Sequence, residues 1–258
     1  MQELIDWHFT VQNGMYFDTK TELNGVSIYL SNIIEDGFWN YAFVPSDISL
    51  ENSIETIESK FNNVNRQPCV YIANSEDCSD KVNKLLTRKY MPLSEESFMT
   101  MKSHNKLIVK PSTATTKRVA DIKTHNDFIE IFTNAYGGDK TPEQPYGELD
   151  KTYIDALIRS FSAMNKFYHF VCYEGKNPVS IATLCFADGK GGLYNVGTAP
   201  AYRGKGYGTI ATKVCIDQWF LLGGDVLFLQ TETGSAVEKW YYKLGFELKF
   251  IGRTYCRE

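Results

Sequence analysis

The stretch 193-LYNVGTAPAYRGKGYGTIATKVCIDQWFLL-222 decides the fold of this chain. Residues 193–198 read as a strand, and residues 207–222 read as a helix with one apolar stripe. Between the two lies a glycine-rich run, Arg203-Gly204-Lys205-Gly206-Tyr207-Gly208. The sequence therefore predicts a strand that feeds a glycine loop at the start of an amphipathic helix.

Such a loop suits a phosphate group. The first turn of a helix presents backbone N–H groups and the positive end of the helix dipole, and glycines let the chain approach an anion closely. The spacing G-x-G-x-G is neither the dinucleotide pattern G-x-G-x-x-G nor the G-x-x-x-x-G-K-[ST] phosphate loop. A helix entry without a ligand is the alternative that this run alone leaves open.

The run resembles the R/Q-x-x-G-x-G/A signature of the GNAT superfamily of acyl-CoA-dependent N-acetyltransferases. Arg203, Gly206 and Gly208 stand at its defining positions. A second resemblance lies at residues 240–246, WYYKLGF, which is similar to the L-Y-x-K-L-G-F segment near the end of the same fold. Together the two motifs identify residues 115–258 as similar to this superfamily.

The resemblance implies an α/β (α+β) fold with a mixed, mostly antiparallel sheet flanked by helices. It also implies that the fourth and fifth strands, residues 193–198 and 226–230, splay apart around the cofactor. We expect a catalytic domain at residues 111–258 and a degenerate GNAT-like domain at residues 1–110. The polar, basic segment 102–120 with Pro111 suggests the boundary.

An internal echo supports tandem copies of one fold. Residues 81–93, KVNKLLTRKYMPL, align with residues 236–248, AVEKWYYKLGFEL, and a short strand precedes and follows each segment. The first copy has no glycine between residues 38 and 53, and it places Asp47 and Glu51 near the start of a helix. Carboxylates there take the place of a pyrophosphate, so we expect no coenzyme A in this copy.

By the resemblance, acetyl-CoA is the expected cofactor, bound mainly by backbone groups of two segments. The strand holds the pantetheine arm and the thioester carbonyl, and the loop holds the pyrophosphate. Arg203 pairing with a surface carboxylate is the alternative for that side chain. The expected cofactor-binding residues are Val196, Gly197, Thr198, Arg203, Gly204, Lys205, Gly206, Tyr207, Gly208 and Thr209.

The resemblance also assigns the proton transfers. Tyr241 stands where the family commonly has a tyrosine that protonates the departing thiolate, and a core aromatic is the alternative. Tyr242 points about 100° away on a helix and is a weaker candidate. Glu232 is the first choice for the base. Water held by Asn195 or Tyr194 is a second possibility, and Asp188 is expected to face solvent in a turn.

The acceptor is expected to be a primary amine of unknown identity. The loop 136–147, with its acids and tyrosines, suits a cationic amine, although an exposed acidic loop fits the same residues. Two other functions stay open: a non-catalytic acyl-CoA sensor, and transfer of a larger acyl or aminoacyl group. Tyr241 favours catalysis.

Composition narrows the class of protein. A net charge of −4 gives no basic footprint for nucleic acid, and no segment has the roughly 18 consecutive apolar residues of a membrane span. We therefore expect a soluble, cytoplasmic protein without nucleic-acid or membrane partners. The six cysteines form no C-x-x-C pair, which predicts reduced thiols and no metal site.

The remaining elements are predicted from periodicity and turn residues. Expected strands cover residues 26–30, 38–44, 69–73, 98–101, 107–109, 168–173, 179–186 and 249–255. Expected helices cover residues 53–61, 81–89, 127–135, 149–161 and 236–244.

Overall fold

The computed structural model describes residues 1–74, 77–102, 113–138 and 148–257. The chain divides into two compact units. Unit 1 comprises Met1–Thr100 and Gln230–Glu258, and unit 2 comprises Met101–Leu229.

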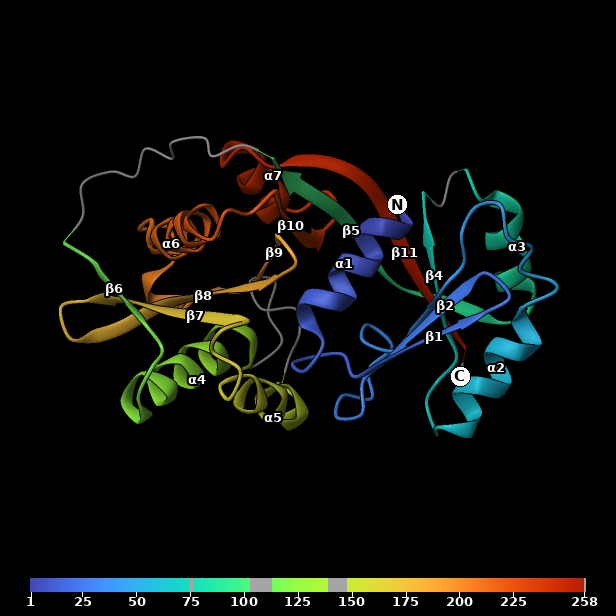
Figure 1. Ribbon diagram of the computed structural model, residues 1–258, viewed down its shortest axis with the longest axis horizontal. Coiled ribbons are helices and arrows are strands. Elements are labelled where there is room, and N and C mark those ends of the chain that lie inside the picture. The colour runs from blue at the N-terminus through green and yellow to red at the C-terminus, as the bar shows by residue number, and fades with distance from the viewer. Residues whose placement is uncertain (75–76, 103–112, 139–147, 258) are drawn as a thin grey trace. The chain divides into compact units, whose positions relative to one another are not determined.

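Unit 1 is a mixed sheet with helices on both faces (Figure 1). The strand order is β1-β2-β3-β4-β11-β5-β10, in which β3 and β4 pair in parallel and β1–β2, β2–β3, β4–β11 and β11–β5 pair antiparallel. Its elements are α1 (Gln2–Gln12), β1 (Thr19–Leu23), β2 (Val26–Leu30), β3 (Tyr41–Phe43), α2 (Ile54–Asn63), β4 (Cys69–Ala73), α3 (Ser79–Thr87), β5 (Tyr90–Met101), α7 (Ala236–Lys243) and β11 (Glu247–Arg257).

The alternation of side chains along β2 shows how both faces of this sheet are covered. Val26, Ile28 and Leu30 join the apolar cluster that packs against α2 and α3. Tyr29 points to the other face, where its ring lies 5.4 Å from Phe9 of α1. Figure 1 shows α1 on the side of the sheet opposite α2 and α3. The sequence analysis missed α1 and β1.

The last strand of the chain, β11, pairs with β4 on one side and β5 on the other. In Figure 1 it appears in red among strands of the N-terminal residues. The compact units therefore differ from the expected domains 1–110 and 111–258 in the placement of residues 230–258. The reason is the backbone pairing of β11, which local sequence patterns do not reveal. A division of the chain into two ancestral copies at residue 110 stays a prediction.

The pairing of β11 also corrects the expectation that all six cysteines are reduced. Cys69 and Cys256 lie directly opposite each other on β4 and β11 and form a disulfide. They are separated by 187 residues in sequence, so only the strand register brings them together. The other four cysteines are buried free thiols.

The strands of unit 2 are mixed and mostly antiparallel, in the order β10-β9-β8-β7-β6. Helices α4 and α5 cover one face and α6 covers the other (Figure 1). The elements are β6 (Thr115–Arg118), α4 (Ile122–Tyr136), α5 (Lys151–Ser160), β7 (Phe167–Glu174), β8 (Asn177–Ala187), β9 (Lys190–Thr198), η1 (Pro200–Tyr202), α6 (Tyr207–Leu221) and β10 (Val226–Glu232). The expected mixed α/β fold is confirmed, whereas the expected strand at residues 107–109 lies outside the described residues.

The fourth and fifth strands of the predicted domain, β9 and β10, pair in parallel over a short distance. Their register runs from Val226 opposite Lys190 to Phe228 opposite Gly192. Strand β9 continues to Thr198 and keeps its antiparallel pairing with β8 on the other side. The expected parting of these strands is therefore present in the described residues.

Glu96 on β5 gives this fold a testable pH dependence. Burial raises the pKa of Glu96 from 4.5 to about 7, although Gln230 donates a hydrogen bond to its Oε2 at 3.3 Å. Between these pKa values the native protein keeps a proton that the unfolded chain has released. The free energy of unfolding therefore falls as pH rises through this window.

We expect Glu96→Gln to raise the free energy of unfolding by on the order of 2 kcal/mol at about pH 8, because no buried charge remains. At about pH 4 the variant and the wild type should be equally stable, since the carboxyl is then protonated in both states. Urea unfolding at the two pH values measures this, with the exposed Glu247→Gln as control. An equal difference at both pH values would contradict a titrating Glu96.

Candidate active site

The loop between β9 and α6 leads into the helix through a glycine with a left-handed backbone conformation. Gly206 is the N-cap of α6 with φ of 90°, and the first bond of the helix runs from the N–H of Ile210 to the carbonyl of Gly206 over 3.2 Å. The N–H groups that precede this bond belong to the first turn, where a helix has no carbonyl of its own to receive them. The loop therefore points the positive end of the α6 dipole outward.

The glycines of this loop leave room for a ligand. Gly204 and Gly206 both have positive φ, and a Cβ atom at either would meet no described atom within 4 Å. At Gly208 a Cβ atom would lie 3.2 Å from the Thr198 hydroxyl, which closes the cradle against β9. The residues present thus fit a pyrophosphate: exposed backbone, open space and the charge of Lys205.

The side chain of Arg203 is bound to the protein itself. Its Nε donates to the carbonyl of Thr198 at 3.2 Å, and one terminal nitrogen donates to the carbonyl of Ala135 at 3.1 Å. This guanidinium thus joins the end of β9 to the last turn of α4 and supports the start of the loop.

Lys205 and Tyr207 flank the glycines in different ways. The ammonium of Lys205 is exposed and lies 4.9 Å from the centre of the Tyr202 ring. The Tyr207 hydroxyl donates to the carboxylate of Glu174, and this hydrogen bond raises the pKa of Tyr207 to about 12. Tyr207 therefore anchors the helix start, while its backbone remains part of the loop.

The middle of β9 carries a bulge. Thr183 of β8 pairs with Tyr194, whereas Ile181 pairs with Gly197, so β9 has one extra residue in this interval. Asn195 lies in the bulge with φ of 53°. The bulge and the parting from β10 occur in the same stretch of strand, which includes the expected cofactor residues Val196, Gly197 and Thr198.

Neighbouring side chains hold the carbonyl groups that follow the bulge. The Tyr136 hydroxyl donates to the carbonyl of Val196 at 2.9 Å, and the Ser180 hydroxyl lies 2.8 Å from the carbonyl of Gly197. Ser180 also lies 2.9 Å from the hydroxyl of Thr198. Sequence reasoning missed these roles of Tyr136 and Ser180, because only the β8–β9 register and the end of α4 place them there.

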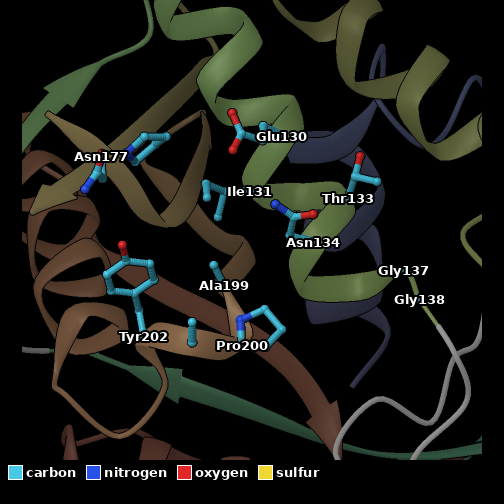
Figure 2. A pocket seen from close by; sticks show the side chains of 12 residues that line it. Glu130, Ile131, Thr133, Asn134, Gly137, Gly138, Asn177, Ala199, Pro200 and Tyr202 are labelled. Atoms are coloured by element: carbon cyan, nitrogen blue, oxygen red, sulfur yellow. The ribbon is translucent and has the colours of Figure 1, made fainter.

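A cavity of about 620 Å³ opens beside the loop (Figure 2). Figure 2 shows it between α4, the start of β8 and η1. Gly137 and Gly138, from the segment expected to build the acceptor site, line it, while residues 139–147 of that segment lie outside the described residues. The polar side chains around it are Glu130, Thr133, Asn134, Asn177 and Tyr202.

The residues expected to move protons differ in burial. Tyr241 on α7 is buried, with its ring centre 4.7 Å from Trp240 and 5.5 Å from Phe246. Its neighbour Tyr242, which points about 100° away on the helix, is exposed. Glu232, at the end of β10, is exposed as well.

The other expected candidates for proton transfer lie in unit 2. Asp188 is exposed in the turn between β8 and β9, as predicted. Burial raises the pKa of Tyr194 well above its usual value, so this phenol stays protonated near neutral pH. Asn195 is partly buried in the bulge.

A glycine loop at the start of a helix, fed by a strand that parts from its neighbour, is the arrangement that the sequence resemblance predicts. Residues 126–246 match the sequence model of the Acetyltransferase (GNAT) family. The C-terminal half of the chain therefore carries a GNAT-family acetyltransferase domain, for which the family implies acyltransferase activity, acyl-CoA and an acceptor substrate.

Solved structures share the fold over most of the chain. A GCN5-related N-acetyltransferase from Kribbella flavida superposes with a TM-score of 0.66 at 18% identity, covering 93% of this chain and 89% of its own. One from Sphaerobacter thermophilus gives 0.66 at 11%, covering 100% and 84%. A tandem GNAT protein from the clavulanic acid biosynthesis pathway gives 0.59 at 8%, covering 90% and 78%. A search of curated proteins gave no match.

The described residues contain no helix that is both long enough and apolar enough to cross a membrane. The expected cytoplasmic location stays a prediction.

Proposed function

We propose that this chain is an N-acetyltransferase that moves an acetyl group from acetyl-CoA to a primary amine by direct attack in a ternary complex. The carrying observation is the cradle at the start of α6, where Gly204 and Gly206 adopt positive φ in open space. The parting of β9 from β10 supports the same function, because the edge of β9 that no longer pairs with β10 has backbone groups to offer a ligand.

The proposed cofactor contacts follow the two segments. Backbone groups of residues 204–209 and Arg203 hold the pyrophosphate, and residues 196–198 hold the pantetheine arm. When bound, acetyl-CoA supplies an acetyl thioester with a good leaving group. The described contacts of Arg203 favour a supporting role for its guanidinium, so its share in the binding is proposed for the backbone.

We propose that Tyr241 donates a proton to the leaving sulfur and that Glu232 serves as the base, directly or through water. The motif at residues 240–246 supports Tyr241. The exposure of Glu232 at the end of β10 supports this role, because its carboxylate is accessible to water and to an incoming amine.

The cavity of Figure 2 is the proposed acceptor site. Glu130 and Asn134 of α4 line it together with the first two glycines of the 136–147 loop. A carboxylate and an amide oxygen suit the N–H groups of a cationic amine.

Release of free thiol from acetyl-CoA tests the proposed reaction. The full chain is mixed with acetyl-CoA, primary amines are added one at a time, and a thiol reagent follows the product. We expect release that depends on the amine. Tight acetyl-CoA binding without amine-dependent release would instead favour a sensor, and preference for longer acyl chains would favour transfer of a larger group.

We expect one coenzyme A site per full-length chain. In unit 1 two carbonyl groups of the segment before α2 bind a cation: the ammonium of Lys81 contacts the carbonyls of Pro45 and Ser46. Glu51 nearby pairs with Lys84 at 3.1 Å. A segment held in this way offers no anion cradle.

Calorimetric titration of the intact chain with coenzyme A measures this stoichiometry. Two sites per chain would contradict the prediction. A single site that persists in Gly206→Val would place the cofactor outside the α6 loop. The intact chain is needed because a fragment ending at residue 105 lacks β11, which fills the space between β4 and β5.

A further inference from the structure

Four side chains of unit 2 form a continuous hydrogen-bonded chain that ends at the β9 bulge. Asn195 Nδ2 lies 3.2 Å from Thr183 Oγ1, and Thr183 Oγ1 lies 2.9 Å from His169 Nδ1. His169 Nε2 lies 2.9 Å from Ser160 Oγ, which in turn lies 2.6 Å from the carbonyl of Leu157. Ser160, His169 and Thr183 are fully or almost fully buried.

The ring of His169 is neutral. Burial lowers its pKa to about 3, and the charges of His125 and Arg118 act in the same direction. The rings of Phe128 and Phe161 pack edge-on against it, with centres 5.1 and 4.9 Å away. A neutral imidazole carries one N–H, so one ring nitrogen donates and the other accepts.

The direction of hydrogen-bond donation along these four side chains follows from Ser160, which lies at the end away from the bulge. Ser160 has one hydroxyl hydrogen and donates it to the carbonyl of Leu157, so Ser160 accepts from His169 Nε2–H. Nδ1 is then the acceptor and takes the hydroxyl hydrogen of Thr183. Thr183 therefore accepts from the amide N–H of Asn195.

This direction fixes which way the Asn195 amide is turned. Its NH2 group faces Thr183, and its carbonyl oxygen Oδ1 is the opposite end of the amide. Asn195 immediately precedes Val196, the first residue of the strand segment proposed to hold the cofactor. An amide oxygen has two lone pairs and accepts N–H groups, which a primary amine supplies.

We propose that His169 and Thr183 are positioning residues for the acceptor amine: they hold the Asn195 amide so that its oxygen, rather than its NH2 group, faces the attacking amine and accepts one of its N–H groups. The proposal rests on the proposed acetyltransferase function. It adds a hydrogen-bond acceptor that selects amines, and it gives the buried histidine a role in orienting that acceptor.

Nitrogen NMR of the histidine ring tests the chain in the protein without any ligand. The wild type should show the Nε2–H tautomer. Asn195→Asp replaces the donor by a carboxylate, to which Thr183 must then donate. His169 must in turn donate from Nδ1, and Ser160 must donate to Nε2. We therefore expect the tautomer to reverse at about pH 8, where a carboxyl is normally ionised.

The exposed Asn165→Asp is the matched control and should leave the tautomer unchanged. If the new carboxyl at position 195 stays protonated at about pH 8, it still donates to Thr183, and an unchanged tautomer then also supports the proposed direction of hydrogen-bond donation. An ionised carboxylate at that position with an unchanged Nε2–H tautomer would overturn the proposal.

Steady-state kinetics tests the role in amine binding. Thr183→Val removes the hydroxyl at nearly constant shape, and we expect KM for the amine to rise about tenfold while acetyl-CoA affinity stays the same. Thr183→Ser keeps the hydroxyl and should restore KM to within about twofold. If Thr183→Val fails to fold, Asn195→Ala replaces it, with the same expected rise.

The outcomes separate this proposal from the proposed function. A wild type that turns over, with an unchanged KM in folded Thr183→Val or Asn195→Ala, would overturn the positioning role and leave the acetyltransferase intact. A wild type that binds no acetyl-CoA would remove the proposed function, and the positioning role with it, while the tautomer measurement would still report on the chain itself.

Discussion

Gly206→Val should lower the affinity for acetyl-CoA by at least about a hundredfold, as measured by calorimetry on the folded variant. Gly206 has φ of 90° at the N-cap of α6, a conformation that a β-branched residue strongly resists. The new side chain would also extend into the open space above the loop, where no described atom lies within 4 Å of a Cβ position. Both the altered backbone and the added side chain would disturb the space in which a pyrophosphate would lie.

The same open space explains why the variant should still fold. A Cβ atom at position 206 meets no described atom within 4 Å, so the main cost is local backbone strain of about 1–3 kcal/mol. Gly223, just beyond the other end of α6, has φ of 71° and equally open surroundings. Gly223→Val should therefore carry similar strain and leave acetyl-CoA affinity unchanged. Unaltered affinity in folded Gly206→Val would show that the cofactor binds elsewhere.

The predicted helix and loop correspond to the structure because their causes are local. Residues 207–222 carry apolar side chains at helical spacing, and α6 covers Tyr207–Leu221. Gly206 marks the start of the helix because a left-handed N-cap favours glycine. The motif therefore located both the element and the place where its first turn opens.

Other features depend on partners distant in the sequence. The disulfide between Cys69 and Cys256 and the place of β11 both follow from strand pairing across most of the chain. Helix α1 was missed because its buried side includes His8 and Gln12, which are polar and hydrogen-bonded to each other. An apolar periodicity does not detect such a helix.

The candidate site likewise combines features that the local sequence reveals with features that depend on distant residues. The glycines of the loop can be recognised in the sequence, whereas the bulge at Asn195 cannot, because a one-residue change of register leaves no pattern in the sequence of β9. His169 and Thr183 lie on β7 and β8 within mostly apolar, buried strands. Only the pairing of these strands reveals that the two side chains meet.

Tyr241→Phe should keep acetyl-CoA affinity and lower turnover by about tenfold to a few hundredfold. The buried ring packs against Trp240 and Phe246, and phenylalanine preserves these contacts, so the change removes the hydroxyl alone. The loss should be moderate because a thiol with a pKa of about 8.5 leaves fairly well without a proton donor.

The neighbouring Tyr242→Phe is the matched control for this prediction, because Tyr242 is the next residue on α7 and is 43% exposed. It should turn over like the wild type. The two variants and the wild type are compared with a thiol reagent at saturating acetyl-CoA across a range of pH. If the hydroxyl of Tyr241 protonates the leaving sulfur, its removal should lower turnover most at the pH values where departure of the unprotonated thiolate is slowest relative to attack by the amine. Equal turnover of Tyr241→Phe and the wild type at every pH would remove Tyr241 from the mechanism and leave it as a core aromatic of α7.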